Sequence, residues 1–295
     1  MFTHANGLAI VGGNCPTVGL AGGFTLGGGI GLLSSKYGLA SDQVLSADVV
    51  TASGELVTAS STENQDLFWA LRGDGGGTFG VVTSMMIKTF PDMTFSTASL
   101  VVMNDGNNTD AIYSAMGTFF RSFPSLVDAG AWLVWVAVPS GFMITPAMVA
   151  GLRPEELDTL FKPTLARMDE LGLQYQYASK EHPDFLSSYY GSMESIWNVS
   201  QYAIGGRMIP RELVEDEAST ETLLAAIRPM ASQTGVVGVA FNVAGAIPSP
   251  DQVAANPYLR RMIFNVNVPL PLNYAGWAAT RAAQHKITHY FMLTL

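Results

Sequence analysis

The sequence predicts an α+β protein in two parts, and three observations support this. Before Pro91 the chain is dense in glycine, and short apolar segments alternate with turn residues, which is typical of short strands. After Pro91, helical patterns alternate with apolar strands. The chain is 48% hydrophobic and only 13% charged, against roughly a quarter charged in an average domain, which indicates extensive buried sheet.

In the first part, residues 7–12 form a short apolar segment typical of a buried strand. Residues 48–51 and 56–59 flank the turn 53–55 and predict a hairpin. Residues 64–71 predict a helix, because a glycine follows at the position where helices end. Residues 79–90 form an extended β-branched run that Pro91 stops.

In the second part, the boundary falls near residues 91–95, and elements of both kinds follow. Helices are expected at 110–123, 154–171 and 211–230, the second with acidic residues in its first turn, as the helix dipole favours. Strands are expected at 131–138, 235–247 and 262–268.

Composition excludes several classes of partner. The net charge is −9, and the 15 Lys and Arg form no stripe, so neither nucleic acid nor an anionic membrane is an expected partner. The most apolar run, 131–138, is much shorter than the roughly 20 residues of a spanning helix. Cys15 is the only cysteine, so no intrachain disulfide can form.

Residues 12–31 form a segment in which nearly every second residue is glycine. Such spacing lets the backbone approach a flat ligand and direct N–H groups toward it. Cys15 lies within this segment, where backbone N–H groups would stabilise its thiolate, although a lone cysteine is often an inert core residue. Residues 75–80 match GxGxxG, but a helix precedes and a strand follows, the reverse of a Rossmann motif.

Three consecutive segments, 12–29, 34–60 and 63–91, resemble the berberine-bridge-enzyme-like oxidoreductases of the VAO/PCMH-type FAD-binding superfamily. The resemblance implies that residues 1–92 are part of a PCMH-type FAD-binding domain. It also implies that residues 93–295 are a substrate-binding domain, an antiparallel sheet backed by helices.

The resemblance also implies the site residues. Cys15 is expected to bond covalently to carbon 6 of the flavin of FAD, which would raise the oxidising power of the ring. The other expected cofactor-binding residues are Pro16, Thr17, Val18, Gly19, Gly22, Gly23, Phe24, Gly27, Gly28, Gly29, Gly38, Leu39, Asp42 and Val82. For the residues from Gly38 onward, shaping a turn or packing in the core is an equal alternative.

The implied reaction is hydride transfer from a small organic substrate to the flavin, with molecular oxygen as the final acceptor. A base on the substrate side would take a proton, and Tyr175, Tyr177 and Tyr202 are candidates only because they are phenols. No metal site is expected, because His285 and His289 lack a third ligand.

Two departures from the family pattern stand out. Phe24 occupies a position where many relatives have a Tyr or His that can hydrogen-bond the flavin. In addition, no pyrophosphate loop with a histidyl attachment precedes Gly12, and the family's closing segment is missing after Leu295. We therefore expect a chain truncated at both ends and poorly soluble. An inactive fragment, a pseudoenzyme or a relative recruited to non-redox catalysis are the alternatives.

Overall fold

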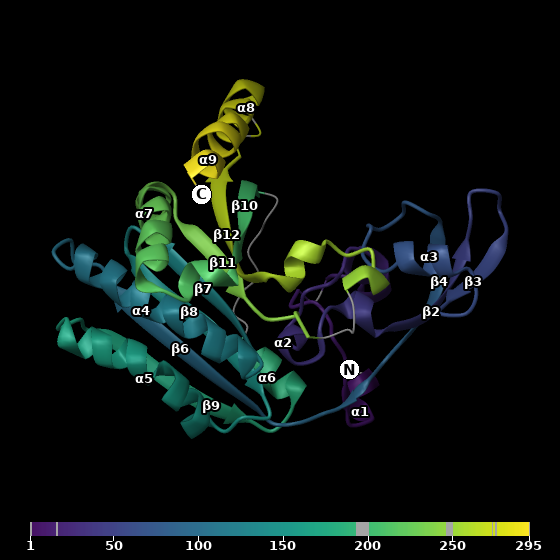
Figure 1. Ribbon diagram of the computed structural model, residues 1–295, viewed down its shortest axis with the longest axis horizontal. Helices are drawn as coiled ribbons and strands as arrows, with labels where there is room; N and C mark the ends of the chain where they lie inside the picture. Colours follow the sequence, from purple (N-terminus) through teal and green to yellow (C-terminus); the bar gives the residue numbers. More distant parts are fainter. Residues whose placement is uncertain are drawn as a thin grey trace.

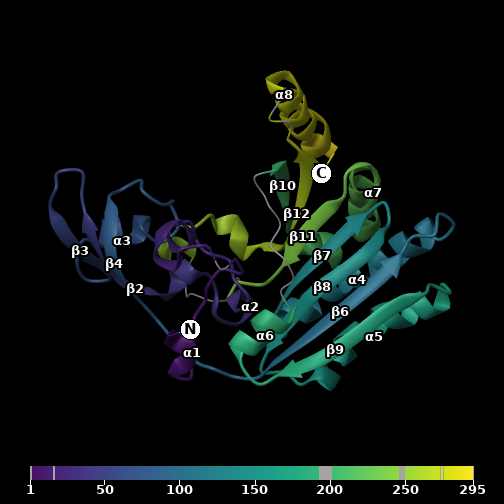
Figure 2. The same ribbon diagram turned by 180° about the vertical axis from the view of Figure 1, so that it is seen from behind.

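The computed structural model describes residues 2–15, 17–192, 201–245, 250–272, 274 and 276–294. Helices and antiparallel sheets form two bodies joined side by side, which confirms the α+β prediction (Figures 1 and 2). None of the described helices is long and apolar enough to cross a membrane.

The first body is built around a three-stranded antiparallel sheet in the order β3-β2-β4. The predicted hairpin forms β2 and β3, and the predicted helix is α3. The predicted strand 79–90 is divided in two, because β4 ends at Ile87 and the chain then turns to pair with β1. The bounds are α1 Phe2–Ala5, β1 Leu8–Ala9, α2 Ser34–Tyr37, β2 Val44–Val50, β3 Leu56–Ser60, α3 Gln65–Ala70, β4 Val81–Ile87 and β5 Phe90–Pro91.

The second body is a seven-stranded antiparallel sheet in the order β10-β12-β11-β7-β8-β6-β9. This confirms the expected antiparallel sheet. The strands are β6 Phe95–Met103, β7 Ala131–Val138, β8 Gly141–Ala150, β9 Tyr175–His182, β10 Tyr202–Pro210, β11 Val236–Ala240 and β12 Met262–Pro271.

Three long helices cover one face of this sheet (Figure 1). They are α4 Thr109–Asp128, α5 Pro154–Glu170 and α7 Glu217–Gln233. Their apolar sides meet alternate sheet residues in the largest core, where Phe120 packs 4.9 Å from Trp135 and 5.1 Å from Phe264, measured between ring centroids. Aromatic pairs at such distances stabilise a core beyond the area that they bury.

Two predicted elements differ from the structure in their bounds. The helix expected at 211–230 is divided into η4 Arg211–Val214 and α7, because Asp216 accepts a hydrogen bond from Ser219 N (2.9 Å) and caps a new helix there. The strand expected at 235–247 ends at Ala240, and the described chain beyond it leaves the sheet.

The segment between β11 and β12 crosses to the first body (Figure 1). It contains η5 Pro250–Gln252 and η6 Pro257–Arg260. Trp69 Nε1 donates to Asp251 O (2.7 Å), and Ala255 N donates to Arg72 O (3.2 Å). A Cβ on Gly73, whose φ is +131°, would lie 2.2 Å from Ala255 N, so only glycine permits this contact.

The remaining helices lie at the junction and at the far edge. The helix α6 Phe185–Ser192 lies between the two bodies, while α8 Trp277–Lys286, η7 Ile287–Phe291 and α9 Met292–Thr294 stand against the edge strand β10 (Figure 2). A second core joins the bodies, with Trp132 and Met148 from the sheet, Phe241 just after β11, and Val11, Leu33 and Phe90 from the first body. The bodies are therefore packed against each other through apolar side chains.

Candidate functional site

We call residues 10–19 the cysteine segment. Its described residues have irregular backbone and lie between β1 and the short helix η1 Leu20–Phe24. Cys15 is partly exposed, and its Sγ lies 3.2 Å from Thr17 Oγ1. Hydrogen bonds from the Thr17 side chain and backbone lower the pKa of the Cys15 thiol. A thiolate is the nucleophilic form of cysteine, so this environment favours reactivity. Pro16, between the two residues, lies outside the described residues.

The glycines that follow divide into two groups. Around Gly19, Gly22 and Gly23, no atom lies within 4 Å of the point where a Cβ would stand, so these residues border open space. Around Gly29 and Gly31 the backbone is packed, since a Cβ on Gly31 would lie 2.0 Å from Gly12 O. The first group thus leaves the backbone uncovered in the turns that follow Cys15 along the chain, and the second holds the loop together.

The remaining predicted loop residues lie in or beside this packed region. Val18 is 45% exposed, and Gly27 and Gly28 connect η1 to the packed turn. The Phe24 ring is held between Gly13 and Gly29, where added Cβ atoms would lie 3.3 Å and 2.9 Å from it. An aromatic ring therefore fits here on packing grounds alone.

Asp42 is the centre of a buried ion pair. Its carboxylate accepts hydrogen bonds from Leu39 N (2.8 Å) and from both terminal nitrogens of Arg260 (2.6 and 2.8 Å). The two side chains are 0% and 5% exposed. Gly38 precedes this turn with φ +92°, and Val82 packs in the core of the small sheet. A direct contact of these four predicted residues with a cofactor stays a prediction.

Sequence reasoning missed Tyr189, which the structure places beside the cysteine segment. It belongs to α6 of the second body, and its hydroxyl donates to Asn14 O at 2.9 Å. Burial, and then the nearby Cys15 thiol, raise the pKa of Tyr189. No local motif distinguishes this tyrosine from Tyr190 next to it, so only the packing of α6 could have identified it.

Two candidate bases lie on the wrong face of the sheet. Tyr175 and Tyr177 point toward the helices, where their hydroxyls donate to Asp169 (3.0 Å) and Asp158 (2.7 Å). Burial raises the pKa of both phenols. Neither faces the cysteine segment. Tyr202 opens β10 and is partly exposed.

The face of the large sheet opposite the helices is turned toward the cysteine segment. Val134 and Val239 on this face pack against the second core, which joins the two bodies, and so do Phe24 and Tyr189. Residues paired across six neighbouring strands continue the face away from the first body. They are Gly206, Asn267, Val237, Val136, Met143 and Val101.

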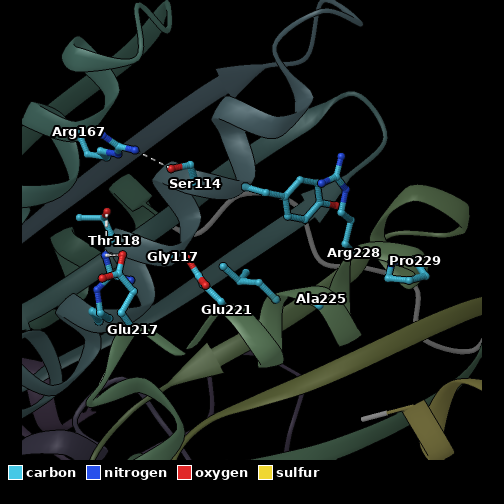
Figure 3. Close-up of a pocket in the computed structure, with 12 residues that line it drawn as sticks. Ser114, Gly117, Thr118, Arg167, Glu217, Glu221, Ala225, Arg228 and Pro229 are labelled. Carbon is cyan, nitrogen blue, oxygen red and sulfur yellow. Dashed lines mark hydrogen bonds and ion pairs between the residues drawn. The ribbon is translucent and has the colours of Figure 1, made fainter. Parts of the chain in front are cut away.

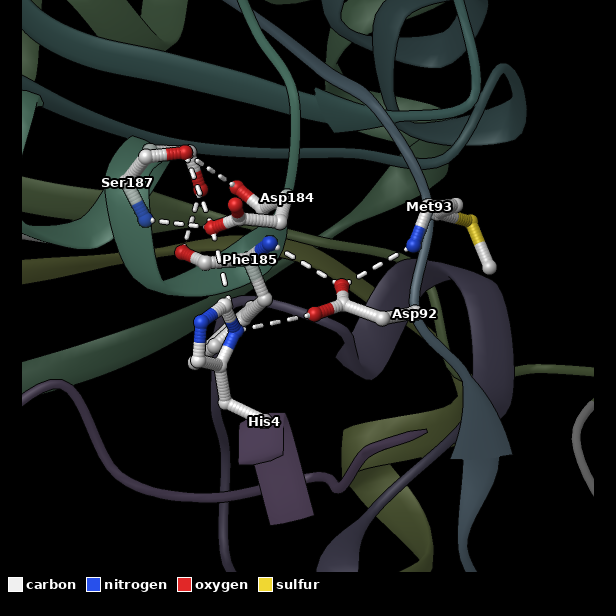
Figure 4. A network of polar contacts seen from close by, with 7 residues as sticks. His4, Asp92, Met93, Asp184, Phe185 and Ser187 are labelled. Carbon is white, nitrogen blue, oxygen red and sulfur yellow. Dashed lines mark hydrogen bonds and ion pairs between the residues drawn. The ribbon is translucent and has the colours of Figure 1, made fainter. Parts of the chain in front are cut away.

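A polar contact ties the two bodies together next to α6 (Figure 4). His4 Nδ1 lies 3.4 Å from Asp92 Oδ2 and 3.9 Å from Asp184 Oδ1. Asp92 Oδ1 accepts from Phe185 N (3.0 Å), and Asp184 Oδ1 accepts from Ser187 N (2.7 Å). The network therefore fixes the first turn of the helix that carries Tyr189. A cation could also be held by these three side chains.

A cavity of about 700 Å³ lies far from Cys15, between α4 and α7 on the helical side (Figure 3). Arg121, Arg167 and Arg228 line it, and each is near an oxygen of a neighbouring side chain. On the described residues it has no connection to the glycine-rich surface. The pair His285 and His289, on α8 and η7, packs ring against ring at 4.2 Å, and no described third ligand joins them.

A reactive cysteine, a bare glycine backbone and an uncharged sheet face together suit a flat aromatic ring with a substrate above it. The residues present fit the ring portion of FAD, because Gly19, Gly22 and Gly23, which follow Cys15 along the chain, border open space. This arrangement is the one expected of a flavin-binding oxidoreductase.

Comparison with known proteins agrees. Residues 2–60 match the family model of the FAD binding domain. The chain is 34% identical over 290 residues to FAD-linked oxidoreductase sor8 of Hypocrea jecorina. This alignment covers 98% of this chain and 50% of the relative. It is 35% identical over 300 residues to FAD-linked oxidoreductase ZEB1 of Gibberella zeae, again 98% of this chain and 51% of the relative.

Solved structures share the fold. The VAO-type flavoprotein MtVAO615 from Myceliophthora thermophila C1 superimposes with a TM-score of 0.89 at 26% identity, over 99% of this chain and 54% of that one. Glucooligosaccharide Oxidase from Acremonium strictum, a protein with a 6-S-cysteinyl FAD, superimposes with a TM-score of 0.75 at 20% identity, over 99% of this chain and 62% of that one. The chain belongs to the VAO-type FAD-linked oxidoreductases, and it spans about half the length of the curated relatives that it matches.

Proposed function

We propose that this chain supplies the flavin-ring and substrate surfaces of an oxidase that takes hydride from a small organic substrate. The observation that carries the proposal is a partly exposed Cys15 with a lowered thiol pKa, followed along the chain by Gly19, Gly22 and Gly23, which border open space. When bound, FAD supplies the two-electron acceptor, and molecular oxygen restores it.

Cys15 is the proposed point of covalent attachment, through Sγ to carbon 6 of the flavin ring. Such a bond would replace the thiol hydrogen and the ring hydrogen, and molecular oxygen would accept the two electrons and two protons released. The Thr17 hydroxyl supports this step by stabilising the thiolate. The 6-S-cysteinyl FAD named for Glucooligosaccharide Oxidase supports the same assignment.

The backbone around Cys15 positions the ring. The space left by the missing side chains of Gly19, Gly22 and Gly23 allows a flat ligand to approach the backbone. Tyr189 holds the carbonyl of Asn14, and it therefore fixes the residue before Cys15 from the opposite body. Substrate would lie against the sheet face opposite the helices. The apolar side chains on that face would exclude water from the substrate.

The names of the relatives favour an oxidoreductase over the alternatives of a pseudoenzyme or an inactive fragment.

Phe24 donates no hydrogen bond to a flavin, and its close packing between Gly13 and Gly29 accounts for a phenyl ring at this position.

The test is an absorbance spectrum of the chain after incubation with FAD, taken before and after acid precipitation. We expect the flavin band to stay with the precipitated protein and to pass into the supernatant in Cys15→Ala. Thr25→Ser, which keeps the buried hydroxyl bonded to Leu20 O, is the matched control and should retain the band. A chain that stays colourless after incubation would refute the proposal.

A further inference from the structure

Five consecutive strands of the large sheet contain no charged residue. The strands β12, β11, β7, β8 and β6 have no Asp, Glu, Lys, Arg or His at any position. One face of these strands packs under the helices, but the other is turned toward the cysteine segment and is only partly covered. An uncharged, partly exposed sheet face of this extent next to a reactive group is suited to an apolar ligand.

Alternation along the strands decides which residues occupy the exposed face. In β12, Phe264, Val266 and Val268 are in the helix-side core, so Asn265 and Asn267 between them point to the opposite face. Pairing across strands places Asn267 opposite Val237, which is in turn opposite Val136. The two amides are therefore polar groups set within a surface of valine and methionine.

The two amides differ in what they already bind. Asn265 Oδ1 accepts from Val239 N at 2.7 Å, in place of a ladder hydrogen bond, so this oxygen is used by the fold. The Asn267 amide lies over Gly206 of β10, where a Cβ would stand 2.6 Å from Asn267 Oδ1. Among the described residues, the Asn267 side chain makes no hydrogen bond.

We propose that the substrate is uncharged and mostly apolar, and that Asn267 binds a carbonyl or hydroxyl oxygen on it. The reaction of this substrate rests on the proposed function, whereas the surface that binds it is made of residues of this chain. A carboxylate or phosphate on the substrate would be buried without a cation, since the five strands offer none. A partly buried amide with no partner gains a hydrogen bond when a carbonyl or hydroxyl arrives.

Three naphthalene probes of nearly equal shape test the proposal by isothermal titration, with and without added FAD. They are 2-acetylnaphthalene, 2-ethylnaphthalene and the anion 2-naphthoate. We expect 2-acetylnaphthalene to bind at least about tenfold more tightly than 2-naphthoate. Asn267→Leu should weaken 2-acetylnaphthalene by about five- to tenfold and change 2-ethylnaphthalene less than about twofold.

A second variant guards against a folding defect. Asn267→Lys introduces a cation on the same face and should reverse the order, with 2-naphthoate the tighter ligand. Misfolding cannot produce such a gain. Asn107→Leu, on an exposed loop, is the matched control and should leave all three affinities unchanged. Equal binding of ketone and anion, no binding of any probe, or an equal loss of all probes in Asn267→Leu would overturn the proposal.

The outcome is separable from that of the proposed function. Flavin retention is read from absorbance, whereas probe selectivity is read from heat in the absence of FAD. A colourless chain that still selects the ketone through Asn267 refutes the oxidase proposal and supports this one. A chain that holds flavin but fails to discriminate between the probes does the reverse.

Discussion

At the scale of single residues, hydrogen bonds from Thr17 lower the pKa of the Cys15 thiol. The Thr17 hydroxyl is the largest cause of the lowered pKa of Cys15, ahead of the Thr17 backbone. Because the thiolate is the reactive form, a lower pKa extends its reactivity to lower pH. Tyr189 acts on the same segment from the other body by holding Asn14 O.

The first prediction concerns this hydroxyl. Thr17→Val removes the side-chain hydrogen bond to Cys15 Sγ, so the pKa of the thiol should rise toward its ordinary value. The rate of alkylation by iodoacetamide, measured against pH, should therefore reach its midpoint at a higher pH than in the wild type. Thr17→Ser keeps the hydroxyl and should keep the wild-type midpoint. Identical profiles for all three proteins would contradict the prediction.

At the scale of elements, the packed turn after the glycines depends on a long-range ion pair. Asp42 lies next to β2, whereas Arg260 ends η6, and the two are brought together only when the segment between β11 and β12 crosses to the first body. Arg260 also donates to Val243 O at 2.9 Å. The pair therefore fixes both the turn and the crossing segment.

The second prediction follows from this burial. Asp42→Asn leaves the buried guanidinium uncompensated and should lower the free energy of unfolding by about 3–5 kcal/mol. Pairing Asp42→Asn with Arg260→Met should recover part of the loss. Glu170→Gln removes the carboxylate of the exposed pair with Arg167 and should cost no more than about 0.5 kcal/mol. Urea unfolding measures the three variants against the wild type, and equal losses for Asp42→Asn and Glu170→Gln would refute the argument.

At the scale of the whole molecule, the small sheet presents an apolar row to solvent. Val50 pairs with Leu56 on one side and Val81 on the other, and Leu56 and Val81 are 65% and 68% exposed. The adjacent row is polar, since Asp48 accepts from Thr58 (2.8 Å) and Ser84 (2.6 Å). Contiguous apolar surface at the end of a sheet favours association.

The third prediction is that Leu56→Thr together with Val81→Thr reduces self-association of the isolated chain. The substitutions keep β-branched or β-compatible residues, so the strands should persist while the apolar row disappears. Sedimentation velocity at several concentrations should show more monomer than in the wild type. Met103→Thr alters an exposed apolar residue in another part of the protein and should have no such effect. An unchanged distribution in the double variant would disprove the prediction.

The sequence alone predicted part of the local structure, although it did not predict β6, β8, β9 or β10. Strong periodicity predicted α4, α5, β7 and β12, and β7 was predicted to the residue, because long apolar patterns depend little on distant contacts. The spacing of glycines around Cys15 predicted a segment that approaches a flat ligand, and the structure shows open space beside three of them.

Only the tertiary structure decided which side chains meet. The sequence did not distinguish Tyr175 and Tyr177 from any other tyrosine, and only the structure shows that they lie under the helices. Tyr189 hydrogen-bonds Asn14, from which it is separated by 175 residues of chain. Asp42 and Arg260 are separated by 218 residues, and Asn267 lies on the sheet face opposite the helices only because of its strand register. Local propensity cannot encode such contacts, because they depend on strand order and on the packing of one body against the other.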